Sequence, residues 1–300
     1  MNLNDLQTFV WVAQSGTLSG AAKRLGIPKS TVSRRIQRLE DAIGHELLRR
    51  TPRSVVLTEQ GKALYLRSAP PLRELQDTAE AISHVDTEPT GILRITTVPG
   101  FGHSHFFVQC IQNYILKYPK TTVDIELTTR LVDMIDEGFD VAIRMHQNEV
   151  PGSASLMSRK LLRLSRAMYA TETYIREKGE PQILADLTNH RLVAHAIVDR
   201  RPIQWHLNGK PIENAMDYPN PRLLVNDSTA LERFALAGAG IAILDKLEGE
   251  MLAKDAKLIR VLPGYEQLGA SASLVWPTSR HMAPRVRAFI QHAVEWVNAE

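Results

Sequence analysis

Apolar residues recur at helical spacing through the first 44 residues of the chain and predict three short helices. Asn4 is placed to cap the first helix, Gly16, Gly26 and Gly44 are placed to end the three, and Pro28 marks the start of the third. The apolar positions are Leu6, Phe9, Val10 and Ala13 in the first helix, Leu18, Ala21, Ala22 and Leu25 in the second, and Val32, Ile36 and Leu39 in the third.

The third helix has two chemically different sides when its residues are placed at 100° intervals. One side is apolar, and the other carries Ser30, Ser33, Arg34 and Gln37. Two short helices, a turn of about four residues and a third helix with a polar outer side together predict a helix-turn-helix. Arginine and glutamine can bond guanine and adenine edges with two hydrogen bonds each, and serine reaches bases or phosphates. The alternative is an ordinary three-helix bundle with a solvated face.

Residues 47–50 and 54–57 have the pattern of two short strands around Thr51-Pro52-Arg53. They predict a hairpin with a basic tip, and a cation at such a tip can insert into a narrow minor groove. A recognition helix followed by a basic hairpin is a winged helix-turn-helix, predicted over residues 1–58. The side chains predicted to contact double-stranded DNA are Lys29, Ser30, Thr31, Ser33, Arg34, Gln37 and Arg53.

A long helix is predicted from Thr58, which caps it, to about Val85, with residues 59–88 as a linker. Apolar residues recur at steps of three and four from Leu64 to Ile82, the seam of a paired helix. A monomer would expose this seam, so we expect a homo-oligomer, either a dimer or a tetramer. Pro70-Pro71 removes two backbone donors in the middle of the helix and predicts a kink or a break.

Strands and helices alternate after the polar segment 86–91, which predicts an α/β domain over residues 89–300. We expect two lobes, lobe I at about 90–161 and 266–300 and lobe II at about 162–265. Lobe I is predicted to have strands at 92–98, 122–128, 141–144 and 273–276 and helices at 101–118, 132–138 and 284–298. Lobe II is predicted to have strands at 165–170, 190–196, 222–225 and 240–244 and a helix at 229–237.

The N-terminal sixty residues resemble the DNA-binding signature of LysR-type transcriptional regulators. The matching positions are Phe9, Ala13, Gly16, Ala21, Ala22, Leu25, Ser33, Arg34, Ile36, Leu39, Glu40, Leu47, Leu48, Arg50, Leu57, Thr58 and Gly61. Many members have Gln-Pro where this chain has Lys29-Ser30, so base preference there is not carried over. The segments GILRITTV, VDIELTTRLVDMIDEGFDVAIR and LLVNDSTALERFALAGAGIAILD resemble the two-lobed, periplasmic-binding-protein-like effector domain of the same family.

This resemblance implies a sequence-specific DNA-binding regulator of transcription that responds to a small organic effector. It also implies antiparallel pairing of the linker helix, a tetramer built from two kinds of dimer, and RNA polymerase as a partner. The alternative is a cytosolic solute-binding protein or an enzyme on the same two-lobed fold. The sequence contains no P-loop, no HExxH and no Ser-His-Asp order, which favours a protein that is not an enzyme.

Ligands of open α/β lobes bind beyond the carboxyl ends of the strands, close to helix N-termini. A carboxylate would suit Arg130 or Arg144, whose alternative role is a structural ion pair. Gly100 stands where several family members carry a hydroxyl residue. The residues predicted to bind the effector are Thr97, Gly100, Phe101, Thr128, Thr129, Arg130, Arg144, Asn226 and Asp227.

Charge is divided unevenly along the chain. Residues 1–58 hold nine basic and four acidic side chains, a net +5 against +3 for all 300 residues, so the remainder carries −2. Such asymmetry favours a polyanionic partner for the N-terminal part, with a solvated basic face as the alternative.

Composition sets the broad class of protein. Apolar residues make up 44% and charged residues 23%, values typical of globular proteins, and no apolar run is long enough to span a membrane. The chain start lacks a secretory signal, so we expect a cytoplasmic protein. The single Cys110 excludes an intrachain disulfide and favours packing over redox sensing. No carboxylate or cysteine stands beside His103 and His105 in the sequence to complete a set of metal ligands, so we expect neither a metal nor a cofactor.

Overall fold

Three short helices separated by left-handed glycines begin the computed structural model, which describes residues 2–50, 55–83, 88–146, 155–196, 205–212, 221–255, 257–278 and 282–299. Gly16, Gly26 and Gly44 have φ of 63°, 63° and 76°, the left-handed conformation that ends a helix and that glycine adopts without strain. The first cap differs from the prediction, because Asn2 rather than Asn4 accepts the first-turn amide. The helices are α1 (Leu3–Ser15), α2 (Leu18–Leu25) and α3 (Lys29–Ile43).

The predicted apolar faces form the core of this bundle. Phe9, Val32 and Ile36 are completely buried, and Leu39 and Leu47 are almost so. The hairpin that follows consists of β1 (Leu48–Arg50) and β2 (Val55–Leu57), which pair antiparallel. The winged helix-turn-helix that the sequence predicts is therefore confirmed in the residues that the structure describes.

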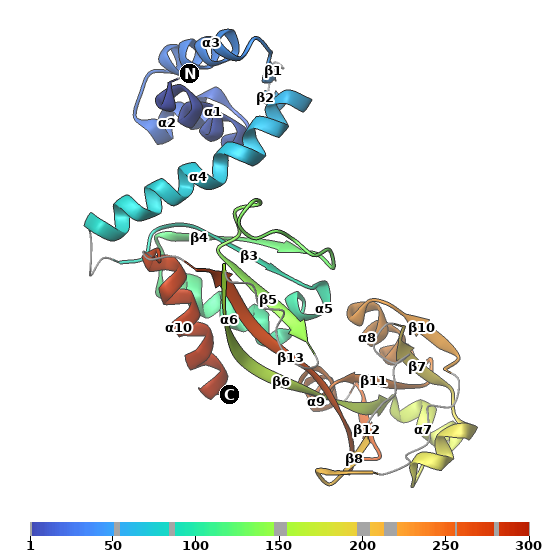
Figure 1. The fold of residues 1–300 in the computed structure, drawn as a ribbon. Coiled ribbons are helices and arrows are strands. Elements are labelled where there is room, and N and C mark those ends of the chain that lie inside the picture. Colours follow the sequence, from blue (N-terminus) through green and yellow to red (C-terminus); the bar gives the residue numbers. More distant parts are fainter. Residues whose placement is uncertain are drawn as a thin grey trace. The chain divides into compact units, whose positions relative to one another are not determined.

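The linker helix α4 spans Glu59–Ser83 without interruption, so of the kink or break expected at Pro70-Pro71 the break is wrong, and the kink stays a prediction (Figure 1). Thr58 caps it as predicted, since its hydroxyl oxygen accepts the Gly61 amide at 3.0 Å. Each proline removes one backbone donor. Leu72, immediately after the prolines, is buried in the core of the N-terminal bundle, and we attribute the continuity of α4 to this packing.

The chain divides into two compact units, one of residues 1–87 with 132–139 and 279–284, and one of the remainder. The described residues of the second unit form one 11-stranded sheet. At one end β3 (Gly91–Thr97) lies parallel between β4 (Thr121–Leu127) and β5 (Val141–His146). At the other end β7 (Leu192–His195) lies parallel between β10 (Leu223–Val225) and β11 (Ile241–Asp245). These two parallel groups are the sheets of the two lobes.

Two long antiparallel strands, β6 (Leu156–Ala170) and β13 (Tyr265–Pro277), join the lobes. Figure 1 shows both strands running from one lobe to the other. β6 pairs with β11 in one lobe and β13 with β5 in the other. The sequence predicted only the ends 165–170 and 273–276 of these strands. The shorter strands are β8 (Trp205–Leu207), β9 (Lys210–Pro211) and β12 (Ile259–Val261).

Helices of the second unit flank the sheet. The predicted helix 101–118 is corrected to two helices. The predicted helix 132–138, a segment that groups with the first unit, is corrected to turns in which the Asp133 carboxylate accepts the amides of Ile135 and Asp136. The terminal helix packs on lobe I as predicted, with Tyr114 and Phe289 edge to face at 5.3 Å. The helices are α5 (Pro99–Gly102), α6 (His105–Lys117), α7 (Glu172–Lys178), η1 (Leu184–Asn189), α8 (Ser228–Leu236), α9 (Lys246–Lys254) and α10 (Pro284–Ala299).

No helix in the described part of the chain is long and apolar enough to cross a membrane.

Candidate functional sites

The face of α3 opposite the core carries the predicted DNA-binding side chains. Lys29, Ser30, Arg34 and Gln37 are exposed, and Thr31 and Ser33 are half-buried at the edges of this face. Arg34 donates to the Thr31 hydroxyl at 3.4 Å, and Gln37 donates to the Asp41 carboxylate at 3.0 Å. Arg53, at the predicted tip of the wing, lies outside the described residues. The arrangement presents guanidinium, amide, ammonium and hydroxyl groups from one helix surface.

Two further arginines of α3 hold the helix against α1. The guanidinium of Arg38 donates two hydrogen bonds, at 2.6 and 3.2 Å, to the carboxylate of Asp5, which is only 3% exposed. These hydrogen bonds raise the pKa of Arg38. Arg35 donates to the hydroxyl of Thr8 at 3.2 Å. Sequence analysis missed these contacts, because a basic residue on a polar helix face gives no sign of a partner 27 or 33 positions away.

Glu40 fixes the start of the wing. Its Oε1 atom accepts the backbone amides of Leu47 and Leu48 at 2.8 and 3.1 Å, and both of these residues are buried. On the other strand of the hairpin, the Val55 amide donates to the carbonyl of Gly16 at 2.9 Å. The wing is therefore tied both to the recognition helix and to the end of α1.

The predicted effector site lies at one edge of lobe I. Because β3 and β4 are parallel, with Thr97 opposite Leu127, the residues that follow them meet at the same edge of the sheet. The Thr128 amide donates to the Thr97 carbonyl at 2.9 Å, which joins the two strand ends directly. Arg144 is half-buried on β5, one residue beyond the end of its pairing with β3.

Several predicted effector residues make structural contacts here. Thr97 is 3% exposed and donates to the Ile143 carbonyl at 3.3 Å. Phe101 is 6% exposed, its ring lying 5.7 Å from that of Phe107. The carboxylate of Asp227 caps α8 by accepting the Ala230 amide at 2.8 Å. These contacts give Thr97, Phe101 and Asp227 a role in shaping the edge.

The remaining predicted residues are more accessible. Thr129, Arg130 and Asn226 are exposed. Arg130 forms a solvent-exposed ion pair with Glu126 at 3.4 Å, and its amide donates to the Thr128 hydroxyl at 3.2 Å. Arg130 therefore forms the ion pair that was the alternative to effector binding. An ion pair this exposed to solvent contributes little to the stability of the fold.

The two lobes touch at this edge, through Gly100 and Ser228 of the predicted site and through further residues that the sequence did not point to. A Cβ atom placed on Gly100 would lie 2.7 Å from the Ser228 hydroxyl, so a side chain there would displace a neighbour. His103 Nδ1 lies 3.0 Å from the Thr229 hydroxyl. The amide of His105 donates to Glu248 Oε1 at 2.7 Å. The six residues of this interlobe seam are Gly100, His103 and His105 of lobe I and Ser228, Thr229 and Glu248 of lobe II.

Partly buried carboxyl groups lie at and beside the interlobe seam in lobe II. Burial, reinforced by the charge of Glu248, raises the pKa of Glu232 to about 7. Burial also raises the pKa of Asp245 to about 6. The pKa of Glu248 is raised above its ordinary value for the same reason. No group of side chains in the described part of the chain has the arrangement of a metal site.

Cys110 belongs to the core of lobe I. It is 4% exposed, and burial raises its pKa to about 12. The thiolate is the reactive form of cysteine, so a thiol in this environment is chemically inert.

Comparison with known proteins covers nearly the whole chain. Residues 3–62 match the model of the bacterial regulatory helix-turn-helix proteins of the lysR family, and residues 86–298 match the LysR substrate binding domain. A similar protein is an HTH-type transcriptional regulator of Xanthomonas campestris pv. campestris, 31% identical over 301 residues that cover 99% of this chain and 86% of the relative. Another is the HTH-type transcriptional regulator PtxR of Pseudomonas aeruginosa, 30% identical over 302 residues that cover 100% and 94%.

A solved structure supports the same fold. CrgA, a LysR-type transcriptional regulator from Neisseria meningitidis, superimposes with a TM-score of 0.59 at 24% identity and 99% coverage of both chains. The family and relatives are regulators of transcription rather than enzymes. The chain belongs to the LysR family of DNA-binding transcriptional regulators that carry an effector-binding domain.

Proposed function

We propose that this regulator reads a specific duplex sequence through the outward face of α3 and contacts the adjacent minor groove through the basic wing. The observation that carries the proposal is the exposed set Lys29, Ser30, Arg34 and Gln37 on the side of α3 away from its buried residues. Arginine and glutamine can each make paired hydrogen bonds to base edges, whereas lysine and serine suit phosphates and bases. The net +5 of residues 1–58 adds the attraction to a polyanion.

The effector is a small organic molecule that carries a carboxylate. It binds at the edge formed by residues 97–101, 128–130 and 226–228, where strand ends and the starts of α5 and α8 come together. Thr129, Arg130 and Asn226 are exposed there, and Arg144 is half-buried on the neighbouring strand. A guanidinium group can bind a carboxylate with two parallel hydrogen bonds, which is why Arg130 and Arg144 are the candidates.

The protein acts in the cytoplasm as a homodimer or homotetramer together with RNA polymerase. Support for self-association comes from Leu75 of the predicted α4 seam, which is 59% exposed, whereas Leu72 of the same seam is buried in the core of the N-terminal bundle. Large apolar side chains exposed along a helix favour a partner surface. An effector can change transcription only if it binds one arrangement of that oligomer better than another.

Selection from a random duplex library by the full-length protein tests the DNA-binding proposal. We expect enrichment of one motif with two related half-sites, whose binding weakens steeply with salt. Absence of any enriched motif at moderate salt would contradict sequence-specific binding.

Calorimetry with a panel of aromatic and aliphatic acids then tests the effector site. An acid that binds the wild type should bind Thr128→Ala and Arg130→Ala more weakly. It should also change the DNase footprint on the selected motif. An acid that binds both variants with wild-type affinity would place the site elsewhere.

A further inference from the structure

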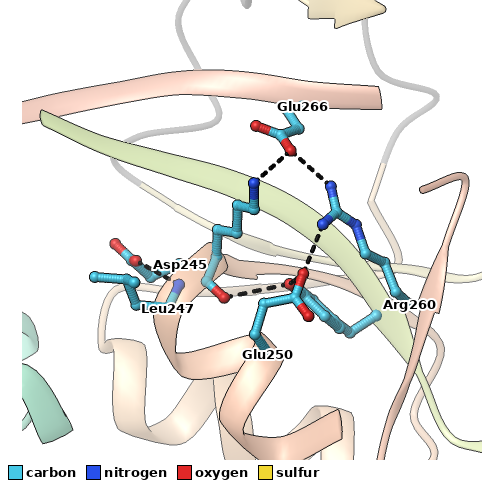
Figure 2. A network of polar contacts seen from close by, with 7 residues as sticks. Asp245, Leu247, Glu250, Arg260 and Glu266 are labelled. Atoms are coloured by element: carbon cyan, nitrogen blue, oxygen red, sulfur yellow. Dashed lines mark hydrogen bonds and ion pairs between the residues drawn. The ribbon is translucent and has the colours of Figure 1, made fainter. Parts of the chain in front are cut away.

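Helix α9 is engaged on two opposite faces. Lys246 and Glu250 are four residues apart and therefore share one face, whereas Glu248 lies about 200° around the helix from Lys246. On the first face Lys246 pairs with Glu266 of β13 at 2.8 Å. Arg260 of β12 pairs with both Glu250 at 2.6 Å and Glu266 at 2.8 Å. Figure 2 shows Arg260 between the two carboxylates. This face of α9 is thereby fixed to the strand that joins the lobes.

The opposite face of α9 reaches lobe I through Glu248. The first amides of an α-helix have no partner within the helix. In α6 the Phe107 amide donates to the hydroxyl of the cap residue Ser104 at 3.2 Å, and the His105 amide donates to Glu248 Oε1 at 2.7 Å. A carboxylate at a helix N-terminus is also favoured by the helix dipole. Glu248 of one lobe thus completes the cap of a helix in the other.

The other contacts of the interlobe seam lie beside this cap. His103 contacts Thr229 at 3.0 Å, and the lack of a side chain at Gly100 allows Ser228 to approach. Gly100 and the start of α8 also belong to the proposed effector edge. The spacing of the lobes at the seam therefore sets the width of that edge.

We infer that Glu248 is a positioning residue that holds the two lobes at the spacing of the effector site by capping α6 from α9. Helix α9 is fixed to β13 and β12 by the ion pairs of Lys246, Glu250, Arg260 and Glu266. It therefore holds α6 at a set distance from β13. The inference rests on the proposed effector site for its functional meaning, but the contact itself can be tested without DNA or effector.

Hydrogen exchange in the full-length protein tests the contact, with uptake in segment 226–236 of lobe II as the readout. Glu248→Ala removes the acceptor. His105→Pro removes the donor without breaking α6, because proline is accepted at the first helical position and Ser104, at φ −63° and ψ 144°, has the backbone that precedes proline. His105→Ala keeps the backbone amide and removes only the ring, whose charge partly offsets the burial that raises the pKa of Glu248, so it is the matched control for the side chain. Glu172→Ala removes an exposed carboxylate of lobe II and controls for charge.

We expect Glu248→Ala and His105→Pro each to accelerate exchange at the start of α8 by roughly three- to tenfold, the range of one charge-assisted cap bond. The double variant should exchange no faster than the faster single variant, and both controls should behave like the wild type. Unchanged exchange in segment 226–236, additive effects in the double variant, or an equal effect of His105→Ala would overturn the inference. If the wild-type protein bound no DNA, the proposed function would be contradicted. The exchange experiment would still test the contact between Glu248 and α6, because it uses neither DNA nor effector.

Discussion

Replacement of Glu40 by alanine should destabilise the N-terminal bundle and weaken DNA binding without removing a phosphate contact. Glu40 accepts the amides of Leu47 and Leu48 at 2.8 and 3.1 Å, and these residues are 1% and 7% exposed. A buried amide without a partner costs about 1–3 kcal/mol. Two such amides give a loss of about 2–4 kcal/mol when the hairpin relaxes around them. Glu40→Gln keeps a carbonyl oxygen at the same place and should lose less than about 1 kcal/mol.

Urea unfolding of the full-length protein, followed by the ¹⁹F resonance of fluorotryptophan at position 11, measures this loss. Trp11 is a suitable reporter because it packs against the bundle core and stacks with Arg24 at 3.5 Å. Glu46→Ala is the control, since it removes the same charge from an exposed position nearby. DNA affinity of Glu40→Ala should fall while the slope of log K against log salt stays constant. An alanine variant within about 0.5 kcal/mol of the wild type, the usual range for neutral surface substitutions, would refute the reasoning.

Three further predictions concern single side chains. A Cβ atom on Gly61 would overlap the carbonyl oxygen of Leu47. Gly61→Ala should therefore destabilise the bundle by about 1–3 kcal/mol in the same urea assay, and an unchanged free energy of unfolding would contradict this packing. Native Cys110 should resist iodoacetamide at pH 8, as followed by mass spectrometry, because burial raises its pKa to about 12; rapid alkylation would contradict its burial. The pKa of Glu232 is raised to about 7, so the folded protein holds a proton that the unfolded chain releases, and stability should fall as pH rises from about 4.5 to about 7. Glu232→Gln should flatten this part of the urea-unfolding profile, and an unchanged slope would exclude Glu232 as its source.

Local sequence patterns predicted the N-terminal bundle well, because its helices are defined by neighbours in sequence. Apolar spacing located the core, and the glycines at the three helix ends could be recognised from their positions. The segment around Asp133 was misjudged because a side-chain carboxylate competes there with the helix for backbone amides. The break expected at Pro70-Pro71 does not occur for the opposite reason, since helix propensity is a local quantity and the packing of Leu72 is not.

Long-range pairing explains what sequence analysis missed in the second unit. Most residues of 156–160 are exposed, so their pattern gave no sign that β6 extends through them to pair with β13. The interlobe seam joins residues more than 120 positions apart, such as His103 and Thr229. Predicted effector residues such as Thr97 and Asp227 were correctly placed near strand ends, but their structural hydrogen bonds could not be foreseen from residue type.

Comparison of base preference between the wild type and Arg34→Ala tests the central claim, that the outward face of α3 reads the DNA sequence. Both full-length proteins would be profiled against the selected motif with every single base-pair change, at one fixed salt concentration. We expect Arg34→Ala to lose about 1–3 kcal/mol of binding free energy on the preferred motif and to discriminate less at one or two base pairs, with the other positions unchanged. Arg176→Ala, which removes an exposed arginine of α7, should keep the wild-type profile. A profile of Arg34→Ala that is identical to the wild type at every base pair would contradict the account.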